Sequence, residues 1–309
     1  MEENMNIKNN ILETMGNTPI VKINQLGKNN GELLVKVESF NPGGSIKDRV
    51  GLHMIEVAEK AGKLAPGALI VEPTSGNTGA GLALAAAVKG YRLILTMPDT
   101  MSMERRALLG AYGAELRLTP GAKGMQGAIE EAEKILQENP GSFMPQQFKN
   151  PSNPETHEES TAKEILQDLE GKLDILVATV GTGGTLTGCA RYLKKHIPGL
   201  QVIAVEPAES PLLSGGKAGP HKIQGIGANF IPEVLETALI DKVACVSAED
   251  AFETARLLAA KEGILCGISS GAALYAGLQE ETKAENKGKR ILVILPDTGE
   301  RYLSSGVFI

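Results

Sequence analysis

The chain has 309 residues, of which 42% are hydrophobic and 22% are charged, and its formal net charge is -6. This composition is typical of a soluble globular protein, and the length suggests two domains. The negative charge argues against nucleic acid as a main partner, and no apolar run approaches the ~20 residues of a membrane span. The start, MEENMNIKNN, is polar and lacks a secretory signal, so we expect a cytoplasmic protein with no membrane association.

Strand-like and helix-like segments alternate along the chain. Strands are predicted at 32–39, 68–73, 92–98, 114–120, 174–180, 201–207, the start of 242–263 and the start of 290–301. Helices are predicted between them at 45–62, 81–90, 102–113, 125–139, 186–196, the end of 242–263 and 267–281. Uninterrupted Val, Ile and Leu runs indicate strands buried on both faces, and the alternation indicates parallel sheets. The predicted fold is α/β, with two three-layer αβα domains, mainly parallel sheets and a cofactor cleft between them.

A Pro- and Asn-rich stretch at 145–154 marks the expected boundary. It divides the chain into an N-terminal α/β domain, residues 1–150, whose first strands could cross into the other domain, and a C-terminal α/β domain, residues 151–309. The loop-like segment 216–232 is long enough to be functional.

The helix predicted at 45–62 has a cation on its apolar side. At 100° per residue, Lys47 falls within the apolar arc, whereas the other charged residues fall on the opposite arc. In one interpretation the ammonium group of Lys47 extends past the helix end into water. In the other, its amine lies in a dry pocket as a nucleophile or base, where the positive end of the helix disfavours the charged form.

The loop TSGNTG follows a predicted strand and opens a helix. It offers backbone N–H groups and small polar donors for an anion, from Thr74, Ser75, Gly76, Asn77 and Thr78. Since the loop has no Lys or Arg, one carboxylate fits better than a polyphosphate. The simpler alternative is a capped turn.

A second glycine-rich loop, VGTGGTLTG, also lies between a predicted strand and a helix. Its N–H groups suit one phosphate and come from Gly181, Thr182, Gly183, Gly184 and Thr185. The GK[ST] ending of a P-loop is missing, and Leu186 stands where a dinucleotide fingerprint needs glycine. A monophosphate cofactor is therefore favoured, and an NAD-dependent oxidoreductase is disfavoured.

Other chemistry-bearing residues give weaker signals. Ser269 and Ser270 precede a small-residue helix, and Asp297 and Thr298 end a strand, where each could simply cap a helix. The three cysteines are widely spaced in apolar stretches, so we expect reduced, buried thiols. The four histidines are scattered without ligand spacing, so no metal site is expected.

A phosphate loop, a carboxylate loop and an inward amine together indicate a pyridoxal-phosphate enzyme acting on an amino acid, with Lys47 forming the Schiff base. From MGNTPIVKI to LPDTGERYLSSGVF, the chain also resembles the fold-type-II pyridoxal-phosphate β-family and, within it, the cysteine synthases (O-acetylserine sulfhydrylases). The similar stretches include NPGGSIKDR, EPTSGNTGAGLALAAAVKGY, FKNPSNPETH, VGTGGTLTG and IQGIGANFIP.

The resemblance implies specific roles for residues in both domains. It implies that Lys47 is the Schiff-base lysine and the base that removes the Cα proton, and that Asn77 binds the phenolic oxygen of the cofactor. It places the substrate carboxylate on residues 74–78 with Gln147, the phosphate on residues 181–185, and the pyridine nitrogen against Ser269. Gly225 and Gly227 are implied to lie near the cofactor, with Gly227 also on the substrate side.

The implied reaction is a β-replacement that converts O-acetyl-L-serine and sulfide to L-cysteine and acetate. The nearest alternative is cystathionine β-synthase chemistry, in which serine or O-acetylserine condenses with homocysteine. Ala228 and Asn229 leave the choice of acceptor open, and O-phosphoserine remains an alternative donor. The resemblance also implies a homodimer and capture of the C-terminal tail of serine acetyltransferase.

Overall fold

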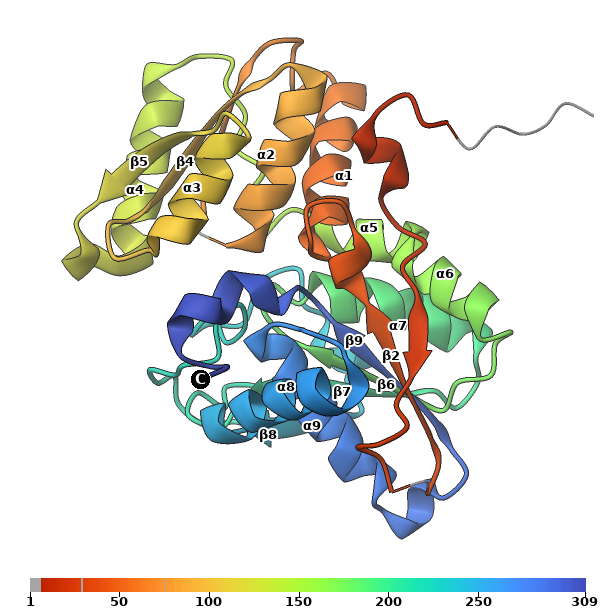
Figure 1. Cartoon of the computed structure of the whole chain (residues 1–309). Coiled ribbons are helices and arrows are strands. Elements are labelled where there is room, and N and C mark those ends of the chain that lie inside the picture. The colour runs from red at the N-terminus through yellow and green to blue at the C-terminus, as the bar shows by residue number, and fades with distance from the viewer. Residues whose placement is uncertain (1–6, 29, 75) are drawn as a thin grey trace, which may run out of the picture. The chain divides into compact units, whose positions relative to one another are not determined.

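The computed structural model describes residues 7–28, 30–74 and 76–309. The chain divides into two compact units. The first comprises the described residues up to 16, with 41–43 and 47–144, and the second comprises 17–40, 44–46 and 145–309. Each unit has its own sheet, shown in Figure 1.

The first unit is built on a three-stranded parallel sheet in the order β3-β4-β5. The strands are β3 (Leu69–Pro73), β4 (Arg92–Pro98) and β5 (Glu115–Thr119), and the helices are α1 (Lys47–Lys60), α2 (Asn77–Lys89), α3 (Met103–Ala111) and α4 (Gly124–Glu138). Ile70 and Leu95 pack with α1, α2 and α3 on one face, whereas Val71 and Ile94 pack with α4 on the other. This unit therefore has the predicted three layers.

The second unit is built on a six-stranded sheet in the order β1-β2-β9-β6-β7-β8. Its strands are β1 (Ile20–Lys22), β2 (Glu32–Val37), β6 (Ile175–Thr179), β7 (Gln201–Pro207), β8 (Lys242–Val246) and β9 (Arg290–Leu295). Its helices are α5 (Ser152–Glu159), α6 (Thr161–Asp168), α7 (Gly184–His196), α8 (Ala248–Glu262) and α9 (Ile268–Glu281). All pairs are parallel except β1 with β2.

Successive residues of the central strands bury alternate faces of this larger sheet. Ile175 and Val177 of β6 pack in the core that holds α8 and α9. Leu176 and Ala178 pack in the core that holds α6 and α7. Both faces of the strand are thus covered, which explains the continuous apolar runs. The α/β prediction with two mainly parallel sheets is confirmed.

Three sequence-based expectations need correction. First, the helix predicted from residue 45 begins at Lys47, and its Asp48 and Arg49 are buried although the wheel placed them towards solvent. The wheel assumes one buried face, but the Asp48 carboxylate turns back and accepts the Gly43 N–H at 2.7 Å. Second, no helix was predicted in the Pro- and Asn-rich stretch, but α5 begins there and α6 follows it. Third, β1 was not predicted, because it has only 3 residues.

The remaining helices and strands lie close to their predicted positions, and the segment between β7 and β8 is irregular except for one short 3-10 turn. Among the described residues, no helix combines the length and apolar character needed to cross a membrane. All three cysteines are free; Cys189 and Cys266 are buried, but Cys245 is exposed on the edge strand β8, contrary to expectation.

Candidate active site

Lys47 is the first residue of α1, and its side chain is partly buried. Two glycines bring α1 against α2 at this point. A Cβ at Gly81 of α2 would clash with the Lys47 carbonyl oxygen and lie 2.8 Å from its carbonyl carbon, and a Cβ at Gly51 would lie 2.5 Å from the Gly81 carbonyl carbon. The two backbones therefore touch without side chains between them. Gly81 lies one helical turn after Asn77, the first residue of α2, so the contact places the Lys47 backbone beside the first turns of α2.

The 74–78 loop connects the carboxyl end of β3 to α2 in the same unit. Thr74 and Thr78 are buried, and the Thr74 hydroxyl accepts the Gly76 N–H at 3.4 Å. Gly76 is the N-cap of α2, and none of the described side chains caps this helix. Among the described residues, nothing therefore supports the simpler alternative of a capped turn. The prediction for Ser75 lies outside the described residues.

The 181–185 loop connects β6 to α7 in the second unit. Gly183 is the N-cap, with φ +83°, and it makes no side-chain cap. A Cβ at Gly183 would lie 2.7 Å from Cβ of Leu235, and a Cβ at Gly181 would clash with the Gly225 carbonyl oxygen. The glycines are therefore needed for the close approach of neighbouring backbone and side chains. They leave a turn of N–H groups at a helix start, suited to one phosphate.

The remaining predicted residues of the second unit adjoin this loop. Asn153 donates to the Gln147 carbonyl oxygen at 2.8 Å and to the Thr182 hydroxyl at 2.9 Å, which links Gln147 to the loop. A Cβ at Gly225 would lie 3.9 Å from Oγ of Ser269, which belongs to the first turn of α9. Gly227 donates its N–H to the Val180 carbonyl oxygen at 3.1 Å, directly before Gly181. The structure thus places these predicted residues around one loop.

Two residues behind the loop were missed by the sequence reasoning. Asn153 and His157 lie on α5 and are fully buried. His157 contacts the Thr185 hydroxyl through Nε2 at 3.3 Å and the Thr161 hydroxyl through Nδ1 at 3.0 Å. Their signal was an Asn and a His in a segment otherwise interpreted as a linker. Both positions would have been notable had the segment been predicted as helix.

The helices α2, α7 and α9 share a glycine at the N-cap position. α2, α7 and α9 have Gly76, Gly183 and Gly267 as N-caps, and none shows a side-chain cap among the described residues. By contrast, α3 and α8 begin at Ser102 and Ser247, whose hydroxyls accept N–H groups of the first turn. A missing side-chain cap does not by itself mark a ligand site, because α4, α5 and α6 also lack one.

A thiol and a carboxylate lie close to Ser269. Cys266 is fully buried, and burial, reinforced by the negative charge of Asp297, raises the pKa of its thiol well above the usual range. The thiol therefore stays neutral. Asp297 is 1% exposed and accepts the Tyr302 hydroxyl at 2.6 Å. Thr298 caps a 3-10 helix, as its simpler interpretation predicted.

The 181–185 loop and its neighbours in the second unit fit a phosphate monoester. The 181–185 loop offers N–H groups and two hydroxyls at a helix start, and Ser269 offers a neutral hydroxyl nearby. The described part of the chain contains no group of three His, Cys, Asp or Glu residues suited to a metal ion. The donor set therefore matches pyridoxal phosphate.

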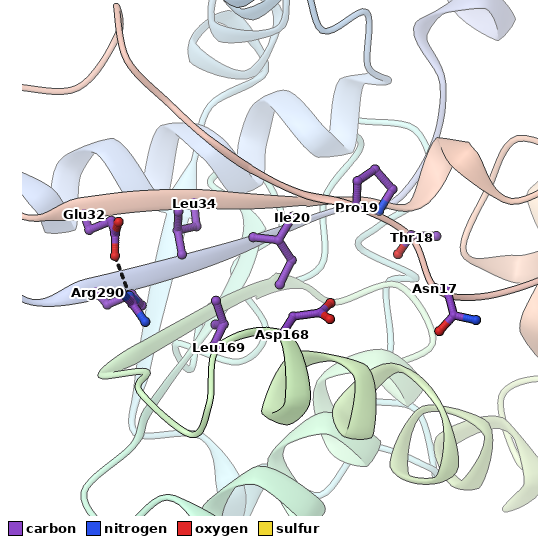
Figure 2. A pocket seen from close by; sticks show the side chains of 9 residues that line it. All are labelled: Asn17, Thr18, Pro19, Ile20, Glu32, Leu34, Asp168, Leu169 and Arg290. Atoms are coloured by element: carbon purple, nitrogen blue, oxygen red, sulfur yellow. Dashed lines mark hydrogen bonds and ion pairs between the residues drawn. The ribbon is translucent and has the colours of Figure 1, made fainter.

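A cavity of about 490 Å³ in the second unit is not part of this site (Figure 2). It is lined by Ile20, Leu34 and Leu169, with Asp168 and the Glu32–Arg290 ion pair around them. Glu32 and Arg290 are the first residues of β2 and β9. The cavity therefore lies at the amino ends of the strands, whereas ligands of such sheets bind at the carboxyl ends.

Comparison with known proteins identifies the family of the chain. Residues 11–297 match the family described as "Pyridoxal-phosphate dependent enzyme". The chain belongs to this family. A cysteine synthase of Staphylococcus aureus is 54% identical over 301 residues, which cover 97% of this chain and 96% of the relative.

Solved structures of the same family superpose over nearly the whole chain. The cysteine synthase of Entamoeba histolytica gives a TM-score of 0.95 at 48% identity, covering 100% of this chain and 93% of that one. A hydrogen sulfide-producing enzyme of Fusobacterium nucleatum gives a TM-score of 0.93 at 47% identity, covering 96% and 100%. The fold is therefore that of the family, and its members depend on pyridoxal phosphate.

Proposed function

We propose that this chain is a cysteine synthase that converts O-acetyl-L-serine and sulfide to L-cysteine and acetate by β-replacement. The observation that carries the proposal is the 54% identity to a cysteine synthase over 97% of the chain. The glycine-capped helix starts of both units support it, because they offer N–H groups for a phosphate and a carboxylate.

In this proposal, the second unit holds the cofactor and the first holds the reacting lysine. Residues 181–185 bind the phosphate, Ser269 donates to or accepts from the pyridine nitrogen, and Asn77 binds the phenolic oxygen. When bound, the cofactor withdraws electrons from the Cα of the amino acid. A neutral hydroxyl at Ser269 does not enforce a positive pyridine as a carboxylate would, which suits β-elimination better than transamination.

Lys47 has two roles in the proposed reaction. It attaches the cofactor covalently in the resting enzyme, and once substrate has displaced it, its amine removes the Cα proton and later returns it. The backbone N–H groups at the start of α2, together with Thr74, Ser75, Thr78 and the side chain of Gln147, receive the substrate carboxylate. The backbone contact between α1 and α2 holds base and carboxylate site in fixed register.

The proposal extends to assembly and location. We expect a homodimer in the cytoplasm, with the carboxylate loop able to accept the C-terminal tail of serine acetyltransferase. Light scattering of the purified protein tests the dimer. A titration with a tail peptide tests the partner, and absence of both binding and inhibition would remove it.

A second activity is favoured by one relative. Since a hydrogen sulfide-producing enzyme of Fusobacterium nucleatum is 47% identical over 96% of the chain, we propose that release of sulfide from cysteine be assayed alongside synthesis. The cystathionine alternative is tested in the same experiment by offering homocysteine in place of sulfide.

The test compares the wild-type protein with Lys47→Ala and with Lys60→Ala as a matched control. Lys60 is an exposed lysine in the last turn of the same helix. We expect a yellow wild-type protein that forms cysteine, a Lys60→Ala variant that matches it, and a Lys47→Ala variant slowed by about 10²–10⁴-fold through loss of proton transfer. Activity only with serine and homocysteine would favour the cystathionine alternative, and a colourless wild-type protein that takes up no pyridoxal phosphate would refute the assignment.

A further inference from the structure

Asn153 lies behind the 181–185 loop, in the first turn of α5, and is fully buried. Its amide nitrogen donates one hydrogen to the Gln147 carbonyl oxygen at 2.8 Å and the other to the Thr182 hydroxyl at 2.9 Å. Because a carbonyl only accepts, the nitrogen of the amide must be the atom that faces Gln147. The bond to Gln147 therefore fixes the orientation of the amide, and with it the direction of the bond to Thr182.

The Thr182 hydroxyl accepts two hydrogen bonds. One comes from Asn153 at 2.9 Å, and the other comes from the backbone N–H of Gly184 at 3.3 Å. A hydroxyl oxygen has two acceptor positions and one hydrogen, so these two bonds leave the hydrogen as the part that it can still offer. Among the described residues, no group accepts that hydrogen. The hydroxyl is therefore oriented as a donor, which is the role that an ionised phosphate oxygen needs.

The amide of Asn153 contributes donors rather than an acceptor. Its Oδ1 is buried, and nothing in the described part of the chain hydrogen-bonds this oxygen. An unpaired buried carbonyl oxygen is unfavourable. Leucine has a similar shape and would avoid this cost, but it would lose both N–H donors. The two donated bonds are therefore what an asparagine supplies at this position.

Gly184, the first residue of α7, makes room for this amide. A Cβ there would clash with Oδ1 of Asn153, and it would lie 2.5 Å from Cγ and 2.9 Å from Nδ2 of the same side chain. The amide thus occupies the space that any other residue at 184 would fill. It cannot shift away without breaking its bonds to Gln147 and Thr182, so the glycine and the asparagine are matched to each other.

We propose that Asn153 is a positioning residue for the cofactor, because it holds the Thr182 hydroxyl as a hydrogen-bond donor to the phosphate group. Asn153 itself does not touch the phosphate in this proposal, and it acts through Thr182. The inference rests on the proposal that residues 181–185 bind the phosphate of pyridoxal phosphate. It goes beyond the proposed reaction, because it concerns the affinity for the cofactor and not the substrates.

The test compares two ligands, pyridoxal phosphate and pyridoxal, which has the same aldehyde but no phosphate. The cofactor is removed from the purified holoenzyme, and the binding of each ligand is followed by the absorbance of the bound ring. For Asn153→Leu we expect the Kd for pyridoxal phosphate to rise about tenfold, through the loss of a hydrogen bond to a charged group. The Kd for pyridoxal should stay close to that of the wild-type protein.

Asn139→Leu is the matched control. The Asn139 amide also donates to a backbone carbonyl oxygen, that of Ile135 at 2.7 Å, but this bond lies at the end of α4 in the first unit. Both Kd values of this variant should match the wild-type values. A rise in the Kd for pyridoxal phosphate that is specific to Asn153→Leu therefore reports on the phosphate loop.

Thr182→Val supplies a second measurement, because valine keeps the shape of threonine but has no hydroxyl to orient. Asn153→Leu should cause little further loss of affinity in the Thr182→Val protein, although each change alone raises the Kd for pyridoxal phosphate. Asn153→Asp should weaken the binding of pyridoxal phosphate at least as much as Asn153→Leu. Its carboxylate would accept the Thr182 hydrogen and would repel the phosphate.

A purely structural role for Asn153 gives a different pattern. The inference is overturned if Asn153→Leu weakens the binding of both ligands equally, if it leaves the Kd for pyridoxal phosphate unchanged, or if its effect is the same in the Thr182→Val protein. Should Asn153→Leu fail to fold, Asn153→Asp decides by the same comparison of the two ligands. A wild-type protein that binds pyridoxal phosphate no better than pyridoxal refutes the phosphate site itself, whereas one that binds it but forms no cysteine refutes only the proposed reaction.

Discussion

Adding one methyl group at Gly81 should disturb the candidate base without touching its side chain. A Cβ at this position would lie 2.8 Å from the carbonyl carbon of Lys47 and 3.1 Å from Cα of Asp48. Both neighbours are backbone atoms of α1, so no side chain can rotate away to make room. We expect Gly81→Ala to push the first turn of α1 away from α2.

The size of the effect follows from two opposing terms. Overpacking a close contact costs about 1–3 kcal/mol, and the Ala gains about 1 kcal/mol from its better helix propensity. The free energy of unfolding should therefore fall by a net amount of about 0–2 kcal/mol. A displacement of the reacting amine by about 1 Å can lower the rate about 10²-fold, so activity should fall more than stability.

Urea unfolding and the rate of cysteine formation check this prediction together. Gly110→Ala is the control, because Gly110 lies in α3, is exposed and has no atom near its hypothetical Cβ. It should gain about 0.5–1 kcal/mol and keep full activity. If Gly81→Ala matched Gly110→Ala in both measurements, the close contact between α1 and α2 would not be what places Lys47.

Three more predictions concern charge and thiol burial. Lys36 is fully buried with its ammonium 2.9 Å from Glu164, so Lys36→Met should lower the free energy of unfolding by about 3 kcal/mol in urea. A thiol reagent should label Cys245 in the folded protein and the other two cysteines only after denaturation, and labelling of all three at one rate would contradict the buried positions. For Glu280, burial opposes the charged form, but hydrogen bonds from two lysines outweigh it and hold the pKa below its usual 4.5. The charged form therefore stabilises the fold above pH 4.5. At pH 7, Glu280→Gln should lower the free energy of unfolding by about 2 kcal/mol, and this loss should shrink as the pH falls below 4.5.

The sequence predicted well whatever depends on short-range pattern. The strands β6 and β9 are apolar on both faces, and the glycine-rich loop at 181–185 lies between a strand and a helix, so both were recognisable without the fold. The helical wheel failed at Asp48 because a helix buried on more than one side has no single solvent face.

What the sequence could not show are contacts between distant segments. Asn153 and His157 support the phosphate loop only because α5 packs against α7, and a segment rich in Pro and Asn gave no reason to expect a helix. The hydrogen bond between His221 and Gly227 was also not predictable from the sequence, because it depends on the path of an irregular segment. Cys245 is exposed because β8 is an edge strand, which is a property of sheet order rather than of local sequence.

The glycine at the start of α2 also sets a limit on how this protein can become more heat-resistant. Gly76 has open space where a Cβ would lie, and its φ of -113° suits any residue. A serine there could cap the helix and add a few tenths of a kcal/mol. Its hydroxyl would then occupy N–H groups that we propose bind the substrate carboxylate. A laboratory selection for thermostability alone should therefore enrich Gly76→Ser and lose turnover, whereas selection for growth without added cysteine should keep the glycine.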